Sequence, residues 1–418
     1  MKLKTKIVSI QKINPAPYNP RVDLKPDDPR YKSMEHSLEE FGYVESLVWN
    51  EKTETLVAGH QRFKIIVASG ATEIEVSVVH LTLEKEKQLN VILNKVRGDW
   101  DGEKLAGLLD ELSCIPDFDL AVTGFDLDEF SEILDRNSNQ DIDDDFDVEA
   151  AVDSITEPIT KLGEMIQLGV HRLLCGDSEN FDDLKKLMGD EKADQADTDA
   201  PYNVNLGVNS KKKRKWSPIA SDNMPQKEYE AWIRKIFENM KRFLRPGAAI
   251  YIWQGHRQFP PMYQILLDLD FHISCVIAWV KESAAFSYAD YSFRSEQCIY
   301  GWLNGASHYF AGEPGETNIW EVKRDATNTY QHPTQKPVAL RQRSVKNSSK
   351  RGDIVLDVFL GSGSLLLACE SLGRRCYGVE IDPKYCDVIV RRYLNYVGRE
   401  KAPQDLWDRY MKGASHVG

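Results

Sequence analysis

Short apolar runs alternate with longer amphipathic stretches along most of the chain. In the N-terminal part the apolar runs lie at 7–10, 47–49, 56–58 and 74–79, and helical patterns lie at 31–41 and 61–69. In the C-terminal part the expected strands lie at 165–168, 171–175, 248–253, 273–280, 298–302 and 354–358, and helices at 227–243 and 259–267. Strands that alternate with helices are typical of a parallel sheet covered on both faces. The pattern predicts a small α/β domain followed by a doubly wound α/β domain.

An acidic segment separates these two parts. It contains the block Asp141, Asp143, Asp144, Asp145, Asp147 and Glu149. Such a dense block of like charges is most simply a solvated linker. At roughly 100–200 residues per domain, the 418 residues suffice for two or three domains. We therefore expect a first domain over 1–135, an acidic linker over 136–155 and a second domain over 156–418.

The composition excludes several classes of protein. With 42% hydrophobic and 28% charged residues, the chain is expected to fold rather than to be disordered. No apolar run approaches the roughly 20 residues that a membrane helix needs, and no apolar stretch follows Met1–Lys6, so we expect a cytoplasmic protein without a membrane partner. The 7 Cys include no C-x-x-C pair, so neither disulfides nor a metal site is indicated, and we interpret them as buried small side chains.

The net charge of -12 hides two basic stretches. Lysines and an arginine fill 211–215, and the span 323–351 contains many basic residues and the single acid Asp325. Each stretch suits contacts with nucleic-acid phosphates, but an ordinary solvated surface has the same composition. The sequence leaves both alternatives open.

A glycine-containing turn follows the last predicted strand. That strand ends in Asp357, and Gly361 and Gly363 precede a helical stretch. Glycines in such a turn let backbone amides approach a nucleotide-type cofactor. The next strand ends in Glu380, where a carboxylate can accept hydrogen bonds from both hydroxyls of a ribose. Leu366 replaces the third glycine of the dinucleotide fingerprint, so an adenosine cofactor other than NAD is predicted.

An acid, a rigid turn and an aromatic ring follow another predicted strand. These are Asp199, Pro201 and Tyr202. Chemistry on the exocyclic amine of a base needs a carboxylate and a carbonyl to accept the amine hydrogens, and a ring to stack on the extruded base. The segment therefore predicts a site for such an amine.

Three motifs together resemble the DNA amino-methyltransferases. Residues 199–202 look like their D-P-P-Y signature, and 359–363 look like their F-x-G-x-G loop for S-adenosylmethionine. Residues 330–337 resemble the H-x-T-x-K-P motif, which precedes that loop in the permuted group. The resemblance covers roughly residues 156–396 and implies a Rossmann-like methyltransferase domain that uses S-adenosylmethionine.

The resemblance implies a role for each matched residue. Asp199 would position the amine within the turn shaped by Pro201, and Tyr202 would stack on the flipped base. The cofactor residues would be Asp177, Lys336, Asp357, Phe359, Gly361, Ser362, Gly363 and Glu380. Ala200 stands where the family has Pro, which keeps the needed carbonyl but removes a restraint on φ. Taken singly, Asp199 as a helix cap and Glu380 in an ion pair with a neighbouring arginine remain alternatives.

Two segments are placed to face double-stranded DNA by their position between the motifs. They are 204–225, which holds Trp216, and the expected target-recognition region at about 281–330. The aromatic residues of the second segment suit stacking on bases, and a role in the packed core is equally open for half of them.

The first domain has a signal of its own. Gly59, His60 and Arg62 lie where a strand enters a helix, an arrangement that predicts a phosphate site. The segment looks like the ParB/sulfiredoxin-type module, whose G-E-R-R box binds nucleotide phosphates. Only Gly59 and Arg62 match that box, so DNA binding and a structural role have equal standing here. A surface ion pair is the alternative for Arg62.

The leading hypothesis is methylation of adenine N6 in DNA. Adenine is favoured because the motif here begins with Asp, whereas the cytosine-N4 members of the family more often begin it with Ser. Cytosine N4 is the alternative. A ParB-like DNA-binding protein with a weakened active site is the rival. On the leading hypothesis the protein is associated with the nucleoid. The sequence leaves open a homodimer, the recognition site and any restriction enzyme partner.

Overall fold

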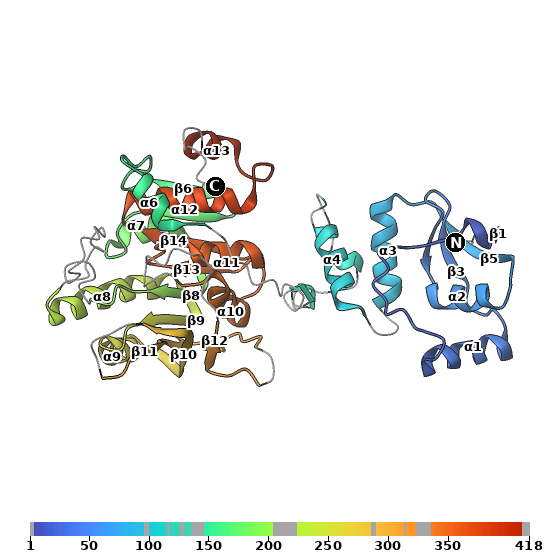
Figure 1. Ribbon diagram of the computed structural model, residues 1–418, viewed down its shortest axis with the longest axis horizontal. Coiled ribbons are helices and arrows are strands. Elements are labelled where there is room, and N and C mark those ends of the chain that lie inside the picture. Colours follow the sequence, from blue (N-terminus) through green and yellow to red (C-terminus); the bar gives the residue numbers. More distant parts are fainter. Residues whose placement is uncertain are drawn as a thin grey trace. The chain divides into compact units, whose positions relative to one another are not determined.

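The computed structural model describes residues 4–95, 100–113, 115, 118, 120–123, 125, 129–131, 133–134, 146–203, 224–285, 290–312, 315–322 and 336–411. The chain divides into two compact units, residues 1–139 and 140–418. Both units combine helices with a sheet, as the sequence predicts, and each is described by itself (Figure 1). No helix in the described ranges is long and apolar enough to cross a membrane.

The N-terminal unit is built on a five-stranded sheet of order β1-β5-β3-β4-β2. Its strands are β1 (Thr5–Ser9), β2 (Asn14–Pro15), β3 (Leu47–Asn50), β4 (Thr55–Ala58) and β5 (Glu73–Val79). Its described helices are α1 (Pro29–Phe41), α2 (His60–Ala68), α3 (Leu83–Lys95) and α4 (Gly102–Ser113), with short 3-10 turns at Ile10–Lys12 and Leu120–Thr123. The apolar runs fill one core, which includes Leu47, Leu56 and Val76, and the apolar side of α4 packs in a second core with Val91 of α3.

The C-terminal unit is built on a nine-stranded sheet of order β12-β10-β11-β9-β8-β13-β14-β7-β6. The strands are β6 (Met165–Leu168), β7 (His171–Cys175), β8 (Ala193–Asp199), β9 (Leu244–Gln254), β10 (Phe271–Ala285), β11 (Phe293–Leu303), β12 (Ile319–Glu321), β13 (Ile354–Asp357) and β14 (Arg375–Glu380). Strands β7, β14, β13, β8 and β9 are parallel. Strand β11 is antiparallel to both β9 and β10, so the sheet is mixed rather than all parallel.

Helices cover both faces of this sheet, which confirms the predicted doubly wound fold. One core contains residues of α7 (Phe181–Met188), α8 (Gln226–Arg242) and α9 (Phe259–Asp268). The core on the other face contains residues of α10 (Val338–Ser348), α11 (Ser364–Leu372), α12 (Pro383–Val397) and α13 (Gln404–Tyr410). Cys175, Cys369, Cys376 and Cys386 are buried, in keeping with their interpretation as small core side chains.

The end of the expected linker is a helix. Helix α6 (Val148–Ser154) packs on α12 through Val148 and Val152, which contact Val388. Asp147, one of the block of acids, caps this helix by accepting hydrogen bonds from the amides of Glu149 and Ala150. Local charge alone suggested a solvated segment, but Val148 and Val152, which lie between the acids, are buried.

The strand connections define where a ligand can bind. From β13 the chain runs through α11 to β14 on one side, and from β8 it runs through α8 to β9 on the other. The sheet order therefore reverses direction between the neighbouring strands β8 and β13. In open α/β sheets the crevice beyond the carboxyl ends of such strands is where ligands bind. Asp199 ends β8 and Asp357 ends β13, so both lie at this point.

Candidate active site at the carboxyl ends of the strands

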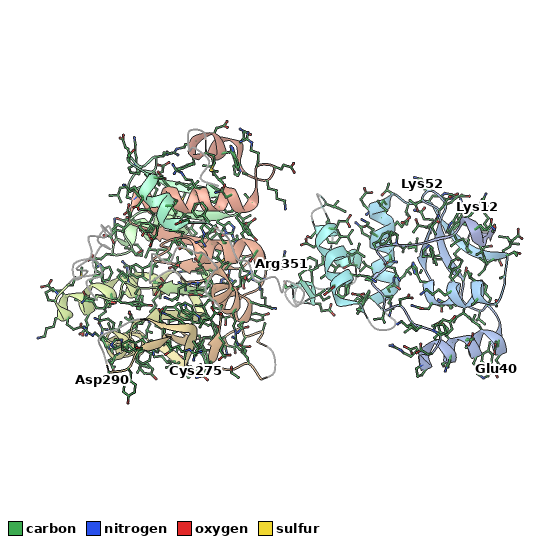
Figure 2. All side chains as sticks on the ribbon, in the orientation of Figure 1. Lys12, Glu40, Lys52, Cys275, Asp290 and Arg351 are labelled. Atoms are coloured by element: carbon green, nitrogen blue, oxygen red, sulfur yellow. The ribbon has the colours of Figure 1, made fainter. Side chains whose placement is uncertain are left out.

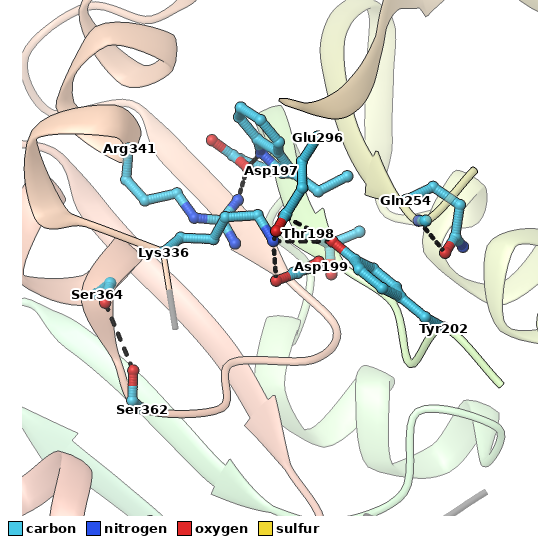
Figure 3. A network of polar contacts seen from close by, with 12 residues as sticks. Asp197, Thr198, Asp199, Tyr202, Gln254, Glu296, Lys336, Arg341, Ser362 and Ser364 are labelled. Carbon is cyan, nitrogen blue, oxygen red and sulfur yellow. Dashed lines mark hydrogen bonds and ion pairs between the residues drawn. The ribbon is translucent and has the colours of Figure 1, made fainter. Parts of the chain in front are cut away.

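Asp199, the last residue of β8, occupies the centre of the candidate site (Figure 3). Its Oδ2 atom lies 2.5 Å from the Nζ of Lys336. Its Oδ1 atom is buried and has no hydrogen-bond partner among the described residues. A buried carboxylate oxygen without a donor is costly unless a ligand supplies one. The carboxylate thus has one oxygen held by the protein and one left for a donor from outside.

Lys336 is buried and contacts three partly buried side chains, Asp199 at the end of β8, Tyr202 from the turn after β8 and Glu296 from β11. Its Nζ lies 2.9 Å from the hydroxyl of Tyr202 and 3.0 Å from Oε2 of Glu296. Burial opposes the charged form of Lys336, but Asp199 and Glu296 outweigh this effect and raise its pKa. Burial likewise opposes the charged form of Glu296, while Lys336 and Lys281 together lower its pKa to about 2. Lys336 and Glu296 therefore stay charged at neutral pH.

Tyr202 is held at both ends. Its hydroxyl donates to Oε2 of Glu296 at 3.2 Å, and its ring lies against Gly255, where an added Cβ would come within 3.0 Å of the ring. The carbonyl of Pro201 accepts a hydrogen bond of 2.7 Å from Tyr229, a residue of α8. Ala200, which precedes Pro201, is 1% exposed and belongs to the core that also contains residues of α8. The turn after β8 is therefore anchored although it lacks the first proline of the family motif.

A second buried ion pair lies behind Asp199. Asp197 accepts from Arg341 and Ser344 of α10, and from the indole Nε1 of Trp253 at 3.0 Å. Arg341 is 4% exposed and Asp197 is fully buried. These contacts tie β8 to the helix that follows Lys336 and so fix the strand from which Asp199 projects.

The turn after β13 has the geometry of a cofactor loop. Gly361 has φ 57° and Gly363 has φ 82°, a left-handed conformation that side chains rarely adopt. Glu380 accepts from the amide of Gly361 at 2.8 Å and from that of Asp382 at 2.9 Å. Each of its oxygens thus has one backbone donor and keeps a lone pair for a ligand.

Burial shifts the pKa values of two carboxylates at this edge of the sheet. Burial raises the pKa of Glu380 to about 7. Burial also raises the pKa of Asp357 to about 7, although Asp357 accepts hydrogen bonds from Thr198 at 2.6 Å and from the amide of Phe359 at 2.9 Å. Asp177 follows the neighbouring strand β7, where the amide of Glu179 donates to it at 2.9 Å. A positively charged ligand would favour the ionised form of Glu380 and Asp357.

The predicted site residues of the C-terminal unit fall into two groups. The group at β8 contains Asp199, Pro201 and Tyr202, and the group at β13, β14 and β7 contains Asp177, Asp357, Phe359, Gly361, Ser362, Gly363 and Glu380. Lys336, which the sequence assigned to the cofactor residues, has its contacts in the first group. Residues 204–223, 286–289 and 323–335 lie outside the described ranges, and with them the lysine run, Trp216 and most of the H-x-T-x-K-P motif.

Sequence reasoning missed two residues of the site. Glu296 lies in β11, where neither its spacing nor its neighbours distinguish it from any strand acid. Arg392 of α12 is 1% exposed, and its NH1 donates to the carbonyl of Ser362 at 2.9 Å and to the hydroxyl of Ser364 at 3.2 Å. Through these hydrogen bonds Arg392 holds the glycine turn in place. A charged residue on the buried side of an amphipathic helix was the available signal.

The expected recognition region contains both core and surface residues. Trp320 is 1% exposed and belongs to β12, so it is a core residue. Phe293 begins β11 and stacks on His256 with ring centroids 4.4 Å apart. Tyr291 is 85% exposed, and Asp290 beside it is also exposed (Figure 2). The aromatic residues of this region thus divide between packing and exposure, as the sequence left open.

The predicted phosphate site of the N-terminal unit has protein partners. His60 accepts a hydrogen bond from the amide of Ala16 at 3.1 Å, and burial lowers its pKa to about 4. It is therefore a neutral acceptor at physiological pH. Arg62 is 2.5 Å from the carboxylate of Glu45, the ion pair named as its alternative. Gly59 has φ 95° and faces Leu47 too closely for a side chain. Phosphate binding at these residues stays a prediction.

Two segments of the chain are similar to known protein families. Residues 194–391 match the family described as DNA methylase, and residues 103–162 match the ParB-methyltransferase HTH domain. The type II methyltransferase M.HpaI of Haemophilus parainfluenzae is 28% identical over 244 residues, which are 53% of this chain and 73% of the relative. The M1.HpyAVI–SAM complex is 22% identical, covers 53% of this chain and 97% of its own, and has a TM-score of 0.42. The ParB protein of Caulobacter crescentus, complexed with CTP-gamma-S, is 16% identical, covers 32% of this chain and 77% of its own, and has a TM-score of 0.21.

Proposed function

We propose that this chain, which joins a ParB-like region to a DNA methyltransferase domain of the N6/N4 amino type, methylates the N6 amine of adenine in DNA. The observation that carries the proposal is the buried Oδ1 of Asp199, which has no donor among the described residues. It lies at the switch point of the sheet, beside an aromatic ring and across from the glycine turn. An amine hydrogen of an extruded base supplies the missing donor.

The protein residues act by positioning. One amine hydrogen is donated to Oδ1 of Asp199 and the other to the carbonyl of Ala200, so the nitrogen lone pair is directed away from both. The Pro201 carbonyl is already occupied by Tyr229, which leaves the Ala200 carbonyl as the acceptor of the turn. Tyr202 stacks on the base. The bond between this nitrogen and the methyl carbon would form as the bond between that carbon and the cofactor sulfur breaks, which would leave a neutral thioether. The methylated amine would then release one proton to solvent.

The residues at β13 and β14 fit S-adenosylmethionine. Glu380 keeps lone pairs for the ribose hydroxyls, and above Gly361 the nearest atom that an added Cβ would meet is 3.9 Å away. The acids Asp177 and Asp357 complement a positively charged group. When bound, the cofactor supplies a methyl group on a cationic sulfur. We assign Phe359, Ser362 and Gly363 to the same site, and Arg392 holds their turn in place.

The choice of adenine rests on the acid that begins the motif. Cytosine N4 presents the same amine geometry, and it is the alternative that Asp199 and Tyr202 serve equally well. The relatives are type II methyltransferases, and we infer a role in restriction-modification from this similarity. The HTH segment at 103–162 would add contacts to double-stranded DNA, and the domain limits, a homodimer and association with the nucleoid stay predictions.

The test identifies the methylated nucleoside. The protein is incubated with unmethylated genomic DNA and S-adenosylmethionine labelled on its methyl group, and the DNA is digested to nucleosides. We expect label in N6-methyl-2′-deoxyadenosine. Label in N4-methylcytosine would refute the adenine assignment, and DNA without label would refute the proposed activity.

Replacing Glu380 should weaken cofactor binding. Because a charge-assisted contact to the ribose is lost, Glu380→Ala should bind S-adenosylmethionine about ten- to hundredfold more weakly in calorimetry. The pKa of about 7 means that Glu380 is neutral below that pH, so the affinity of the wild type should fall as the pH drops from 8 to 6. Glu238→Ala, at an exposed acid of α8, is the control. Unchanged affinity in Glu380→Ala would remove the residue from the cofactor site.

A further inference from the structure

We propose that Lys336 and Glu296 form a positioning pair that holds both Asp199 and Tyr202 in the geometry needed for methyl transfer. The inference rests on the proposed function and extends it. It gives Lys336 a role toward the target base rather than toward the cofactor, and it assigns a role to Glu296, which no motif marks.

Lys336 has as many acceptors around it as its ammonium group has hydrogens. An ammonium group has three hydrogens, and three acceptors surround it: Oδ2 of Asp199 at 2.5 Å, the hydroxyl of Tyr202 at 2.9 Å and Oε2 of Glu296 at 3.0 Å. Lys336 is only 3% exposed. All its hydrogens are therefore used within the site, and none is left for the carboxylate of a cofactor.

Lys336 also fixes the orientation of the Asp199 carboxylate. Because Lys336 takes Oδ2, the carboxylate cannot rotate freely, and Oδ1 remains the oxygen without a donor among the described residues. Tyr202 is fixed by the same pair, since its hydroxyl accepts from Lys336 and donates to Glu296. One buried ion pair thus sets the acceptor for the amine and the ring for the base together (Figure 3).

The charges around Lys336 compensate one another. Lys281, Glu296, Lys336 and Asp199 alternate in sign, and Glu296 is paired with both lysines. A buried lysine is tolerated only when its charge is compensated and its hydrogens are bonded. Asp199 alone would leave Lys336 two hydrogens short of acceptors. Glu296 supplies the second charge, and Lys281 from β10 keeps Glu296 ionised.

The experiment compares Lys336→Met and Glu296→Gln with wild type on unmethylated genomic DNA at saturating S-adenosylmethionine. Loss of the restraint on Asp199 should lower kcat about a hundredfold in Lys336→Met and less in Glu296→Gln, while the Kd for the cofactor stays within about twofold in calorimetry. Lys235→Met, at an exposed lysine of α8, should leave both quantities unchanged. An unchanged kcat in Lys336→Met would overturn the inference. A tenfold weaker cofactor Kd with wild-type kcat would return Lys336 to the cofactor site.

A second measurement does not depend on activity. Without Lys336 the carboxylate of Asp199 is left buried without its cation, so the Tm of Lys336→Met should rise as the pH falls from 8 to 6, relative to wild type. The titratable groups that interact electrostatically with this carboxylate, besides Lys336, are Tyr202, Cys298 and Arg341. Glu296, which is paired with Lys281, lies on the other side of Lys336. Parallel Tm curves for the two proteins would contradict the pairing. If wild type labels cytosine instead of adenine, the adenine proposal fails while the comparison of variants still decides the role of the pair.

Discussion

Asp199→Ala should reduce methyl transfer by at least about a thousandfold, because the variant loses the buried acceptor that aims the amine. Cofactor binding should stay within a few-fold of wild type, since Glu380 and the glycine turn lie at other strand ends. The variant should fold, because Lys336 keeps Glu296 and Tyr202 as partners. Initial rates on unmethylated genomic DNA, together with calorimetry of S-adenosylmethionine, measure the two effects.

Asp268→Ala is the matched control for this prediction. Asp268 is an exposed acid of α9 that pairs with Arg234, so its loss should leave the rate unchanged. Full turnover in Asp199→Ala would place the active site elsewhere. A large loss of cofactor affinity in the same variant would mean that Asp199 belongs to the cofactor site.

Arg341→Met should destabilise the protein by about 3–5 kcal/mol, because it leaves the carboxylate of Asp197 buried without its cation. Trp253 and Ser344 still donate to Asp197, but neither carries a charge. The loss should appear in the free energy of unfolding measured by denaturant titration. Because β8 carries Asp199, activity should fall as well.

Two further variants test whether the loss of stability comes from the unpaired charge of Asp197 or from the lost packing of the arginine side chain. Arg234→Met removes an arginine from an exposed pair and should change stability by about 1 kcal/mol or less. The double variant Arg341→Met with Asp197→Asn removes both charges and should recover much of the lost stability. If Arg341→Met alone is as stable as wild type, the buried ion pair does not support β8.

The sequence by itself determined the order of the elements and the location of the motifs. Apolar runs at 248–253 and 354–358 became strands β9 and β13, because burial on both faces of a sheet demands such runs. The glycine turn could also be predicted from local sequence, because Gly361 and Gly363 adopt backbone angles that other residues rarely accept. The antiparallel direction of β11 could not be predicted, because an apolar run indicates that a strand forms but not which way it runs in the sheet.

The tertiary structure alone decided which charged side chains meet. Lys336 and Asp199 are 137 residues apart in the chain, and their contact depends on α10 packing beside β8. Glu296 reaches Lys336 only because β11 runs antiparallel to β9 and so begins at the edge where β8 ends. Local pattern reports whether a residue is buried on average, whereas the partner of a buried charge is set by the order and direction of the strands.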